Sequence, residues 1–372
     1  MHSGYRVLVT GGYGFFGSRL VERLARLEGL SIVVAGRHAA SAQALVQTLQ
    51  ASATAELHPA ALDVHTPSLE QALAQWTPDV VVHTSGPFQG QNHHVAETCI
   101  RHGTHYIDLA DGRDFVAGIG ALDASAKAAG VLVLSGASSV PALSAAAADH
   151  LSRGMALVRS IDIGISPGNR TERGLSTVQG ILSYCGQTIA HADGRSELGW
   201  GRSYRHRYGA PVGARLLSPC EVPDLGLLPA RYPGAPTVRF GAGLELAFLH
   251  RGMNLMALAR RLGLVRDWSA HARLLTRAAD LFKTWGSDAG AMHVRAKGVD
   301  HRDQPIARTW ELIATEGHGP YVPTLAAWAL VKKLAAGEPL PSGARPCTGL
   351  LSLKDFDEAA TGLRITTRVE EA

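Results

Sequence analysis

Residues 7–20 read Val7-Leu8-Val9-Thr10-Gly11-Gly12-Tyr13-Gly14-Phe15-Phe16-Gly17-Ser18-Arg19-Leu20, an apolar strand pattern that runs into a glycine-rich turn and then a helix pattern. Gly12, Gly14 and Gly17 fit G-x-G-x-x-G, in which the early glycines let the backbone approach a pyrophosphate and the last allows close helix-on-strand packing. The helix then offers free N–H groups and its positive dipole end to phosphate. The stretch predicts a dinucleotide site that includes Phe15 and Phe16, although such turns also occur as plain connections in α/β proteins.

The end of the second predicted strand indicates which dinucleotide is bound. It reads Ala35-Gly36-Arg37-His38, with Arg37 twenty residues after Gly17. Sites for NAD usually place an acidic residue here, whereas an arginine accommodates the 2′-phosphate of NADP. We therefore expect NADP(H) as the cofactor. The alternative is that Arg37 is an ordinary surface arginine.

Length and composition limit the class of protein. A chain of 372 residues is longer than one hydrophobic core usually supports, which predicts two domains. The net charge of +4 comes from scattered arginines rather than a basic block, so we expect no nucleic-acid partner. The cysteines lie far apart and no H-E-x-x-H motif occurs. We therefore predict free thiols in a reducing compartment and no metal site.

The N-terminus and the hydropathy pattern bear on location. The chain enters its first strand pattern directly, without room for a cleavable leader. No uninterrupted apolar run approaches the ~18 residues that a membrane helix needs. We expect a cytoplasmic protein without a membrane partner.

Over residues 1–140, short apolar runs alternate with helical patterns, which is typical of parallel sheets built from βαβ units. Right-handed crossovers would order such strands as a doubly wound Rossmann sheet, with a ligand crevice at the carboxyl ends of the strands. We predict strands at 7–9, 32–35, 60–64, 80–84, 105–109 and 131–134, and helices at 18–27, 40–51, 67–76, 91–102 and 119–129.

Small or polar residues follow several of these strands. Asp63 follows the third strand and is expected either to face the adenine or to cap a helix. The turn of Ser85, Gly86 and Pro87 after the fourth strand suits the ribose and nicotinamide. Asp108 and Asp111 end the fifth strand. Ser138 follows the sixth, where serine hydroxyls are expected to cap a new helix.

The pattern changes beyond residue 140. We expect a substrate and oligomerisation domain over 141–320, an α+β domain with a mixed or antiparallel sheet, including a hairpin of 292–299 and 307–315. Residues 321–372 form the predicted C-terminal segment. Residues 245–285 predict two amphipathic helices, whose apolar faces carry Leu255, Leu258, Leu262, Leu274, Leu275, Leu281 and Phe282. By contrast, 199–240 is rich in Arg, Tyr and Pro and shows little periodicity.

Two families share parts of these motifs. The opening turn also fits T-G-x-x-G-x-x-G of extended short-chain dehydrogenases, but no tyrosine here has the lysine four residues later that their chemistry needs. Over about 1–150 the chain instead resembles the saccharopine dehydrogenase-like NADP-binding family, in the motifs 35–37 (Ala-Gly-Arg), 86–89 (Gly-Pro-Phe-Gln), 103–109 (Gly-Thr-His-Tyr-Ile-Asp-Leu) and 138–141 (Ser-Ser-Val-Pro).

That resemblance implies a Rossmann domain, an α/β domain whose sheet covers the nicotinamide, and a C-terminal segment that packs back on the Rossmann domain. It does not imply saccharopine as the substrate. Relatives act on imine-linked amino acids or polyamine precursors, and one branch is described as enoyl reductase.

Hydride transfer needs orientation of the reactants and a group that handles the accompanying proton. The candidate catalytic residues are His318, Asp108, Tyr184 and Tyr204, of which His318 lies between two glycines that leave its ring accessible. Guanidinium groups match carboxylates, and the candidates for binding a substrate carboxylate are Arg173, Arg202, Arg205 and Arg215. Each of these residues also has a purely structural or solvated interpretation.

We therefore predict a homodimeric NADP(H)-dependent oxidoreductase that acts on a C–N or imine bond of a small carboxylated metabolite. The alternatives are an enoyl or carbonyl reductase on the same scaffold, or a non-catalytic regulator that senses NADP(H). The size of the second domain argues against the regulator, because a sensor needs no substrate pocket.

Overall fold

A computed structural model describes residues 4–371, which form two compact units. The first unit is the chain up to Leu143 together with Tyr321–Ala359, and the second is Ser144–Pro320 together with the chain from Ala360. The segment predicted as 321–372 is thus divided between the units. Its last strand, β16 (Ile365–Glu371), pairs with β14 (Pro305–Ala314) of the second unit.

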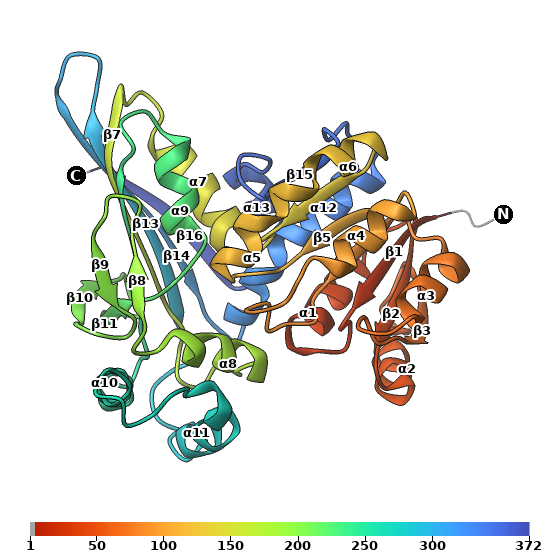
Figure 1. Ribbon diagram of the computed structural model, residues 1–372, viewed down its shortest axis with the longest axis horizontal. Helices are drawn as coiled ribbons and strands as arrows, with labels where there is room; N and C mark the ends of the chain where they lie inside the picture. Colours follow the sequence, from red (N-terminus) through yellow and green to blue (C-terminus); the bar gives the residue numbers. More distant parts are fainter. Residues whose placement is uncertain (1–3, 372) are drawn as a thin grey trace. The chain divides into compact units, whose positions relative to one another are not determined.

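The first unit is built on a parallel sheet in the order β15-β6-β5-β4-β1-β2-β3 (Figure 1). The order 3-2-1-4-5-6 is that of a doubly wound dinucleotide-binding sheet, which reverses between β1 and β4 and is here extended by β15 at one edge. The Rossmann prediction is confirmed. The strands are β1 (Tyr5–Thr10), β2 (Leu30–Gly36), β3 (Glu56–Ala61), β4 (Val80–His83), β5 (His105–Asp108), β6 (Leu132–Ser135) and β15 (Gly343–Pro346).

Both faces of this sheet are covered, because consecutive residues of β2, of β4 and of β1 after Tyr5 are all buried. The third strand begins at Glu56 rather than at the predicted residue 60. The covering helices are α1 (Phe15–Leu24), α2 (Ala39–Leu49), α3 (Ser68–Trp76), α4 (His94–Arg101), α5 (Arg113–Gly118), α6 (Asp123–Ala128), α12 (Leu325–Ala335) and α13 (Leu353–Ala359), with short η1 (Ile119–Leu122) and η2 (Ser139–Leu143).

The second unit is built on a mixed sheet in the order β10-β11-β12-β7-β13-β14-β16, which confirms the predicted α+β class. Only the pair β12 and β7 is parallel; the other neighbours are antiparallel. Its further strands are β7 (Leu157–Ser166), β10 (Tyr204–Arg207), β11 (Ala214–Pro219), β12 (Thr237–Ala242) and β13 (Gly290–Val299), with a separate ribbon of β8 (Thr188–Ala190) and β9 (Ser196–Leu198). Its helices are α7 (Ser144–Leu151), α8 (Leu175–Tyr184), α9 (Asp224–Arg231), α10 (Ala247–Arg261) and α11 (Ala272–Asp280), with η3 (Ser269–His271), while η4 (Gly319–Thr324) spans the boundary between the units.

The two faces of this mixed sheet differ in chemistry. Helices α7 and α9 pack on one face (Figure 1), where Ile163, Val294 and Trp310 are buried. Strand residues alternate between faces, so Asp162 and His293 lie on the other side. Because of this alternation, the polar side chains gather in a cluster on one face of the sheet. The cluster includes residues of β10, a strand that the sequence patterns did not predict.

Helices α10 and α11 lie where two amphipathic helices were predicted. An apolar stripe on a helix usually faces the protein core. Here Leu255, Leu258, Leu262, Leu274 and Leu281 are exposed instead.

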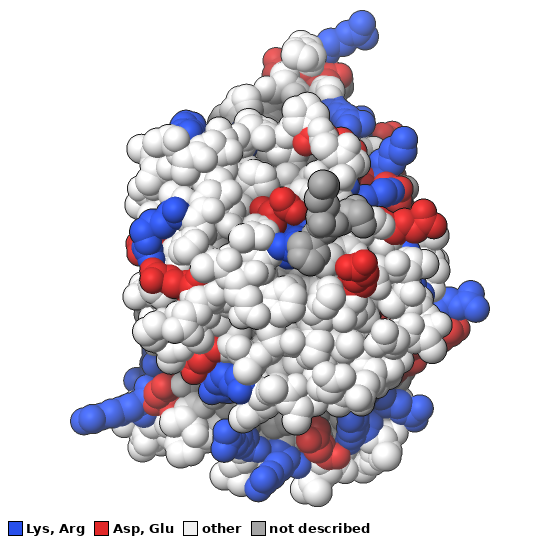
Figure 2. All heavy atoms as spheres, turned by 90° about the vertical axis from the view of Figure 1, so that its right-hand side faces the viewer, with Lys and Arg blue, Asp and Glu red and all other residues white. Residues whose placement is uncertain are grey.

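On the face shown in Figure 2, basic and acidic side chains are interspersed, and no large area carries charge of one sign only. Among residues 4–371, no helix combines the length and apolar character needed to cross a bilayer.

Candidate cofactor and substrate sites

The turn between β1 and α1 has the geometry of a phosphate cradle. Gly14 is the N-cap residue of α1, where no side chain bonds to the opening amide groups of the helix. A Cβ atom at Gly17 would overlap the carbonyl oxygen of Gly11, so the turn can close this tightly only with glycine. Gly11 itself has φ +70°, in the left-handed region. The first turn of α1 has no acidic side chain, which leaves it electrostatically suited to phosphate.

The end of β4 lies directly against this turn. The Thr84 hydroxyl donates to the carbonyl oxygen of Thr10 at 2.8 Å. A Cβ at Gly11 would lie 2.7 Å from the Ser85 hydroxyl oxygen, so Ser85 borders the glycine turn. The next peptide bond, Gly86–Pro87, is cis, and the Gln91 amide donates to the carbonyl oxygen of Pro87 at 2.6 Å. The structure thus brings the predicted segments 11–17 and 85–87 together where the sheet order reverses.

The end of β2 presents Arg37 to solvent. Tyr13 from the glycine turn packs over Gly36, and its hydroxyl accepts the backbone N–H of His38 at 2.8 Å. Arg37 is therefore exposed beside the turn, and no carboxylate follows β2 before α2 begins. Phe15 and Phe16 are half-buried at the start of α1, with their ring centroids 4.9 Å apart.

Asp63 and Ser138 form hydrogen bonds with residues that lie close to them in the sequence. Asp63 Oδ1 accepts the backbone N–H of His65 at 3.1 Å, so this carboxylate closes the turn after β3. It does not cap the following helix, because the N-cap of α3 is Pro67 and no side chain bonds to that end of the helix. The contact of Asp63 with adenine stays a prediction. Ser138 is buried, and its carbonyl oxygen accepts the N–H of Leu143.

Asp108 is fully buried at the end of β5. Its Oδ1 accepts hydrogen bonds from the N–H groups of Ala110 and Gly136, at 2.9 and 2.8 Å, and from the Ser135 hydroxyl at 3.0 Å. Burial raises the pKa of Asp108 to about 6, although these hydrogen bonds act in the opposite direction. A carboxylate enclosed in this way ties the ends of β5 and β6 together, and its catalytic role stays a prediction. Asp111 accepts from the Gln89 amide at 3.1 Å, and burial raises its pKa.

In the second unit, Asp162 on β7 is the centre of a charged cluster. Both of its oxygens accept from the Arg239 guanidinium on β12, each at 2.9 Å. The guanidinium carbon lies 3.9 Å from the centre of the Tyr204 ring on β10, a cation–π contact. Burial acts to raise the pKa of Asp162, but His293 and Arg239 outweigh it and hold the pKa well below its usual range. Asp162 is therefore ionised at neutral pH.

His293 on β13 is fully buried beside Asp162. Its Nε2 lies 3.7 Å from Asp162 Oδ2, and its Nδ1 is 3.0 Å from the Tyr208 hydroxyl. The His206 ring stacks on the His293 ring, with centroids 3.6 Å apart and an interplanar angle of 2°. Burial, followed by the proximity of His293, lowers the pKa of His206 to about 4, so His206 is neutral at pH 7. Only the contact between His293 and Tyr208 is a hydrogen bond; His293 Nε2 has no hydrogen-bond partner among the described residues and meets Asp162 at ion-pair distance. These three groups lie in a row and each can hold a proton or a charge, and we call them the Asp162–His293–Tyr208 relay.

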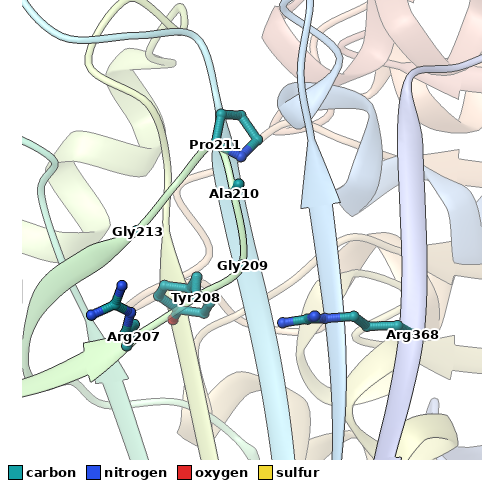
Figure 3. Close-up of a pocket in the computed structure, with 7 residues that line it drawn as sticks. All are labelled: Arg207, Tyr208, Gly209, Ala210, Pro211, Gly213 and Arg368. Carbon is teal, nitrogen blue, oxygen red and sulfur yellow. The ribbon is translucent and has the colours of Figure 1, made fainter.

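Tyr208 also lines a pocket of about 460 Å³ in the second unit. Figure 3 shows the guanidinium groups of Arg207 and Arg368 on either side of Tyr208. Arg207 is exposed, whereas Arg368 is paired with Glu311 and Glu370, each at 2.9 Å. The other lining residues are Gly209, Ala210, Pro211 and Gly213. The pocket therefore combines a cationic rim with one end of the relay.

The other predicted catalytic residues hold different positions. His318 Nδ1 accepts the N–H of Arg364 at 2.8 Å, which fixes the segment between β14 and β16. The Tyr184 hydroxyl bonds to the buried Cys220 thiol, whose pKa burial raises to about 12. Tyr204 belongs to the Asp162 cluster, and burial raises its pKa above the usual value.

The predicted substrate arginines are largely engaged elsewhere. Arg215 is buried and pairs with Glu245 at 3.1 Å. Arg173 donates to the Asn169 side-chain oxygen at 2.6 Å. Arg202 and Arg205 are exposed, and Arg205 lies on the face of β10 opposite Tyr204 and His206. The structure does not bring these four arginines together.

The sequence prediction missed Asp162, His206, Tyr208, Arg239 and His293. The alternation Tyr204-x-His206-x-Tyr208 was a readable signal, since residues two apart share one face of a strand. Asp162 and His293 lie singly in apolar strands and meet only through strand pairing. Within residues 4–371, no group of three or more His, Cys, Asp or Glu is arranged to hold a metal ion.

Comparison with known proteins agrees with this geometry. Residues 7–134 match the family model described as saccharopine dehydrogenase NADP binding domain. That match covers β1 to β6, including the glycine turn, Arg37 and the segment 85–87. No curated protein matches the chain.

Among solved structures, the fold is similar to that of apo saccharopine dehydrogenase (L-Glu forming) from Saccharomyces cerevisiae. The identity is 16%, the similarity covers 99% of this chain and 100% of that one, and the TM-score is 0.67. An amine dehydrogenase from Mycobacterium smegmatis matches at 12% identity over 92% of this chain and 94% of that one, with a TM-score of 0.47. The first likeness extends the agreement in fold to both units. Residues 7–134 thus form an NADP-binding domain of the saccharopine dehydrogenase type, and the chain is an oxidoreductase that uses a nicotinamide dinucleotide.

Proposed function

We propose that this oxidoreductase is NADP(H)-dependent and interconverts a C–N single bond and an imine in a small carboxylated metabolite of the amino-acid type. The observation that carries the proposal is that the Asp162–His293–Tyr208 relay ends in the pocket flanked by Arg207 and Arg368. A proton-handling chain and a cationic rim in one pocket suit a substrate that has both a titrating nitrogen and a carboxylate.

Arg207 is the residue that we assign to the substrate carboxylate. Its guanidinium is exposed on the pocket rim, and no ion pair joins it to another of the described residues. Arginine binds carboxylates through two parallel hydrogen bonds, which also orients the bound group. Arg368 is neutralised by Glu311 and Glu370 and serves as a wall of the pocket.

Tyr208 is the member of the relay that we assign to the substrate nitrogen. When the C–N bond is oxidised, the carbon loses a hydride and the nitrogen loses a proton; when the imine is reduced, both are returned. A nicotinamide held by the first unit would supply or accept the hydride. The Tyr208 hydroxyl donates or takes up the proton at nitrogen, and His293 Nδ1, 3.0 Å behind it, restores the hydroxyl. Ionised Asp162 stabilises the protonated imidazole of His293.

In the first unit, the glycine turn and the start of α1 would hold the pyrophosphate, and Arg37 would hold the 2′-phosphate. A Cβ at Gly17 would overlap the carbonyl oxygen of Gly11, so the tight turn that presents the backbone amides depends on glycine at this position. We also propose that the enzyme works in the cytoplasm, as its free cysteines suggest, and that it is a homodimer.

The test is a panel of substrates assayed by the change in NADPH absorbance. Because the yeast protein of this fold is described as an L-Glu-forming dehydrogenase, secondary-amine amino acids and mixtures of 2-oxo acids with amino acids come first. Ketones and enoyl thioesters form the second arm. Turnover in the first arm that falls at least tenfold in Arg207→Ala supports the proposal. Turnover confined to the second arm assigns a carbonyl or enoyl reductase, and NADPH binding without any turnover favours a sensor.

A further inference from the structure

Helices α10 and α11 of the second unit carry large apolar side chains that no other part of the described chain covers. Leu255 is 67% exposed, Leu262 65%, Leu274 67% and Leu281 79%. Phe248, at the start of α10, packs against Phe282 and Trp285, which follow α11, with ring centroids 4.9 and 5.9 Å away. This aromatic contact joins the two helices, so their exposed side chains belong to one region, which we call the α10–α11 surface.

The orientation of α10 is fixed by contacts on its opposite side. The Asn254 amide donates to the carbonyl oxygens of Trp200 and Gly201, at 2.9 and 3.0 Å. His250 Nε2 is within 3.0 Å of the hydroxyl groups of Ser203 and Ser218. These bonds hold one face of the helix against the sheet, so Phe248, Leu255, Leu258 and Leu262, which recur at helical spacing, must face outward.

The α10–α11 surface is also cationic. No hydrogen bond or ion pair joins any of its peripheral basic side chains to another described residue; these are Arg251, Arg261, Arg266, Arg273, Arg277 and Lys283. Over 247–285 the only acidic residues are Asp267 and Asp280. Asp267 is engaged, since both of its oxygens accept hydrogen bonds from Ser269. Exposed leucines are therefore interspersed with positive charges that this chain leaves unneutralised.

We propose that the α10–α11 surface binds the face of a bilayer that contains anionic phospholipids. The leucines and Trp285 enter the boundary between headgroups and acyl chains, and the arginines contact the headgroup phosphates. Apolar residues on one side of a helix with arginines around them are the ordinary composition of helices that lie in a membrane interface, and anionic leaflets attract such cations. The prediction of no membrane partner rested on the lack of a spanning run, which does not bear on binding of this kind.

Charge distinguishes a bilayer from a second copy of this chain as the occupant. In a two-fold symmetric dimer the same patch meets itself, so Arg251, Arg273 and Arg277 would face identical cations. A lipid surface supplies phosphate to each of them. An acidic peptide would neutralise the arginines but would leave Leu262, Leu264 and Leu281 in water.

The experiment is co-sedimentation of the full-length protein with two kinds of vesicle, phosphatidylcholine alone and phosphatidylcholine with phosphatidylglycerol. We expect binding to the anionic vesicles that is at least tenfold tighter than to the neutral ones and that weakens with added salt. Leu255→Ser combined with Leu258→Ser should weaken it at least tenfold, and Arg273→Glu combined with Arg277→Glu should abolish the preference for anionic vesicles. Val369→Ser and Arg153→Glu are single changes of the same kind, aliphatic to serine and arginine to glutamate, at exposed sites outside this surface, and should leave binding unchanged.

NADPH affinity and thermal unfolding, measured on the same variants, show whether each has folded. The proposal is overturned if the wild-type protein stays in the supernatant with anionic vesicles. It is also overturned if the wild-type protein is a dimer in solution that the leucine pair of substitutions makes monomeric, because the surface is then a subunit interface. None of these measurements uses a substrate, so their outcome is independent of the reaction proposed above.

Discussion

Asp108 in the first unit and Asp162 in the second are carboxylates held in opposite ways. Asp108 accepts hydrogen bonds from the backbone of Ala110 and Gly136, and burial raises its pKa to about 6. Asp162 accepts two hydrogen bonds from the Arg239 side chain and lies 3.7 Å from His293, and its pKa lies well below the usual range. The ends of the first sheet are thus organised through the main chain. The polar face of the second sheet is organised through side chains that bond to one another.

This difference has a consequence for function. A site made of backbone amides, like the turn at Gly17, is destroyed by adding an atom and tolerates changes of nearby side chains. A site made of side chains, like the relay through His293, is destroyed by removing one. Substitutions that add or remove atoms therefore separate cofactor binding from chemistry.

The largest effect is expected from Gly17→Ala. The added Cβ would overlap the carbonyl oxygen of Gly11, so the turn must open and its amides lose their convergence on the phosphates. We expect NADPH affinity, measured by fluorescence titration, to fall at least a hundredfold. Gly120→Ala is the matched control, because no atom lies within 4 Å of a Cβ at that glycine. Tight binding by Gly17→Ala would show that the cradle is not made by the backbone.

The relay gives an effect of similar size, on turnover rather than on cofactor binding. His293→Asn removes the imidazole between Asp162 and Tyr208, and the loss of positioned proton transfer typically costs about 10²- to 10⁴-fold in rate. We expect kcat on the substrate found by the panel to fall by about that factor, with NADPH affinity within twofold of wild type. His301→Asn makes the same change in the exposed turn between β13 and β14 and should be silent. Unchanged kcat in His293→Asn would place the chemistry elsewhere.

The first unit was largely predictable because its chemistry is local in the sequence. The glycine turn, Arg37 and the segment 85–87 each follow an apolar strand directly, and parallel strands bring their carboxyl ends to one edge of the sheet. The buried state of Asp108 was not readable, since its partners at 135 and 136 approach only when β5 and β6 pair.

The second unit was predictable in class but not in its site. His293 pairs in register with Gly164, and this pairing places its ring next to Asp162, more than a hundred residues earlier in the chain. Arg215 was a plausible carboxylate ligand until folding supplied Glu245 as its partner. The sequence around a single polar residue in an apolar strand does not indicate which residue of a neighbouring strand it will contact.

Asp108→Asn should change how stability depends on pH. A carboxyl group whose pKa is higher in the folded state than in the unfolded state binds its proton more tightly when folded, so wild-type stability falls as pH rises from about 4 to about 6. A shift from 3.8 to about 6 corresponds to about 3 kcal/mol across that interval. Asn keeps the acceptor oxygen but cannot ionise. The free energy of unfolding of the variant, measured by urea titration, should therefore not show this decrease between pH 4 and pH 6. The exposed Asp114→Asn should retain the wild-type pH dependence.

The smallest effect is expected from Arg37→Ala, which tests the one side chain that we assign to the cofactor in a site otherwise made of backbone. Hydrogen bonds to charged groups contribute about 1.5–3 kcal/mol, and solvent exposure places Arg37 at the low end of that range. We expect NADPH affinity to fall about tenfold and NADH affinity to remain within twofold, because only NADPH carries the 2′-phosphate. Arg101→Ala removes an exposed arginine that pairs with Glu70 in the same unit and should change neither affinity. Equal losses for both cofactors would mean that Arg37 supports the turn itself, and the selectivity would then have to come from the backbone after all.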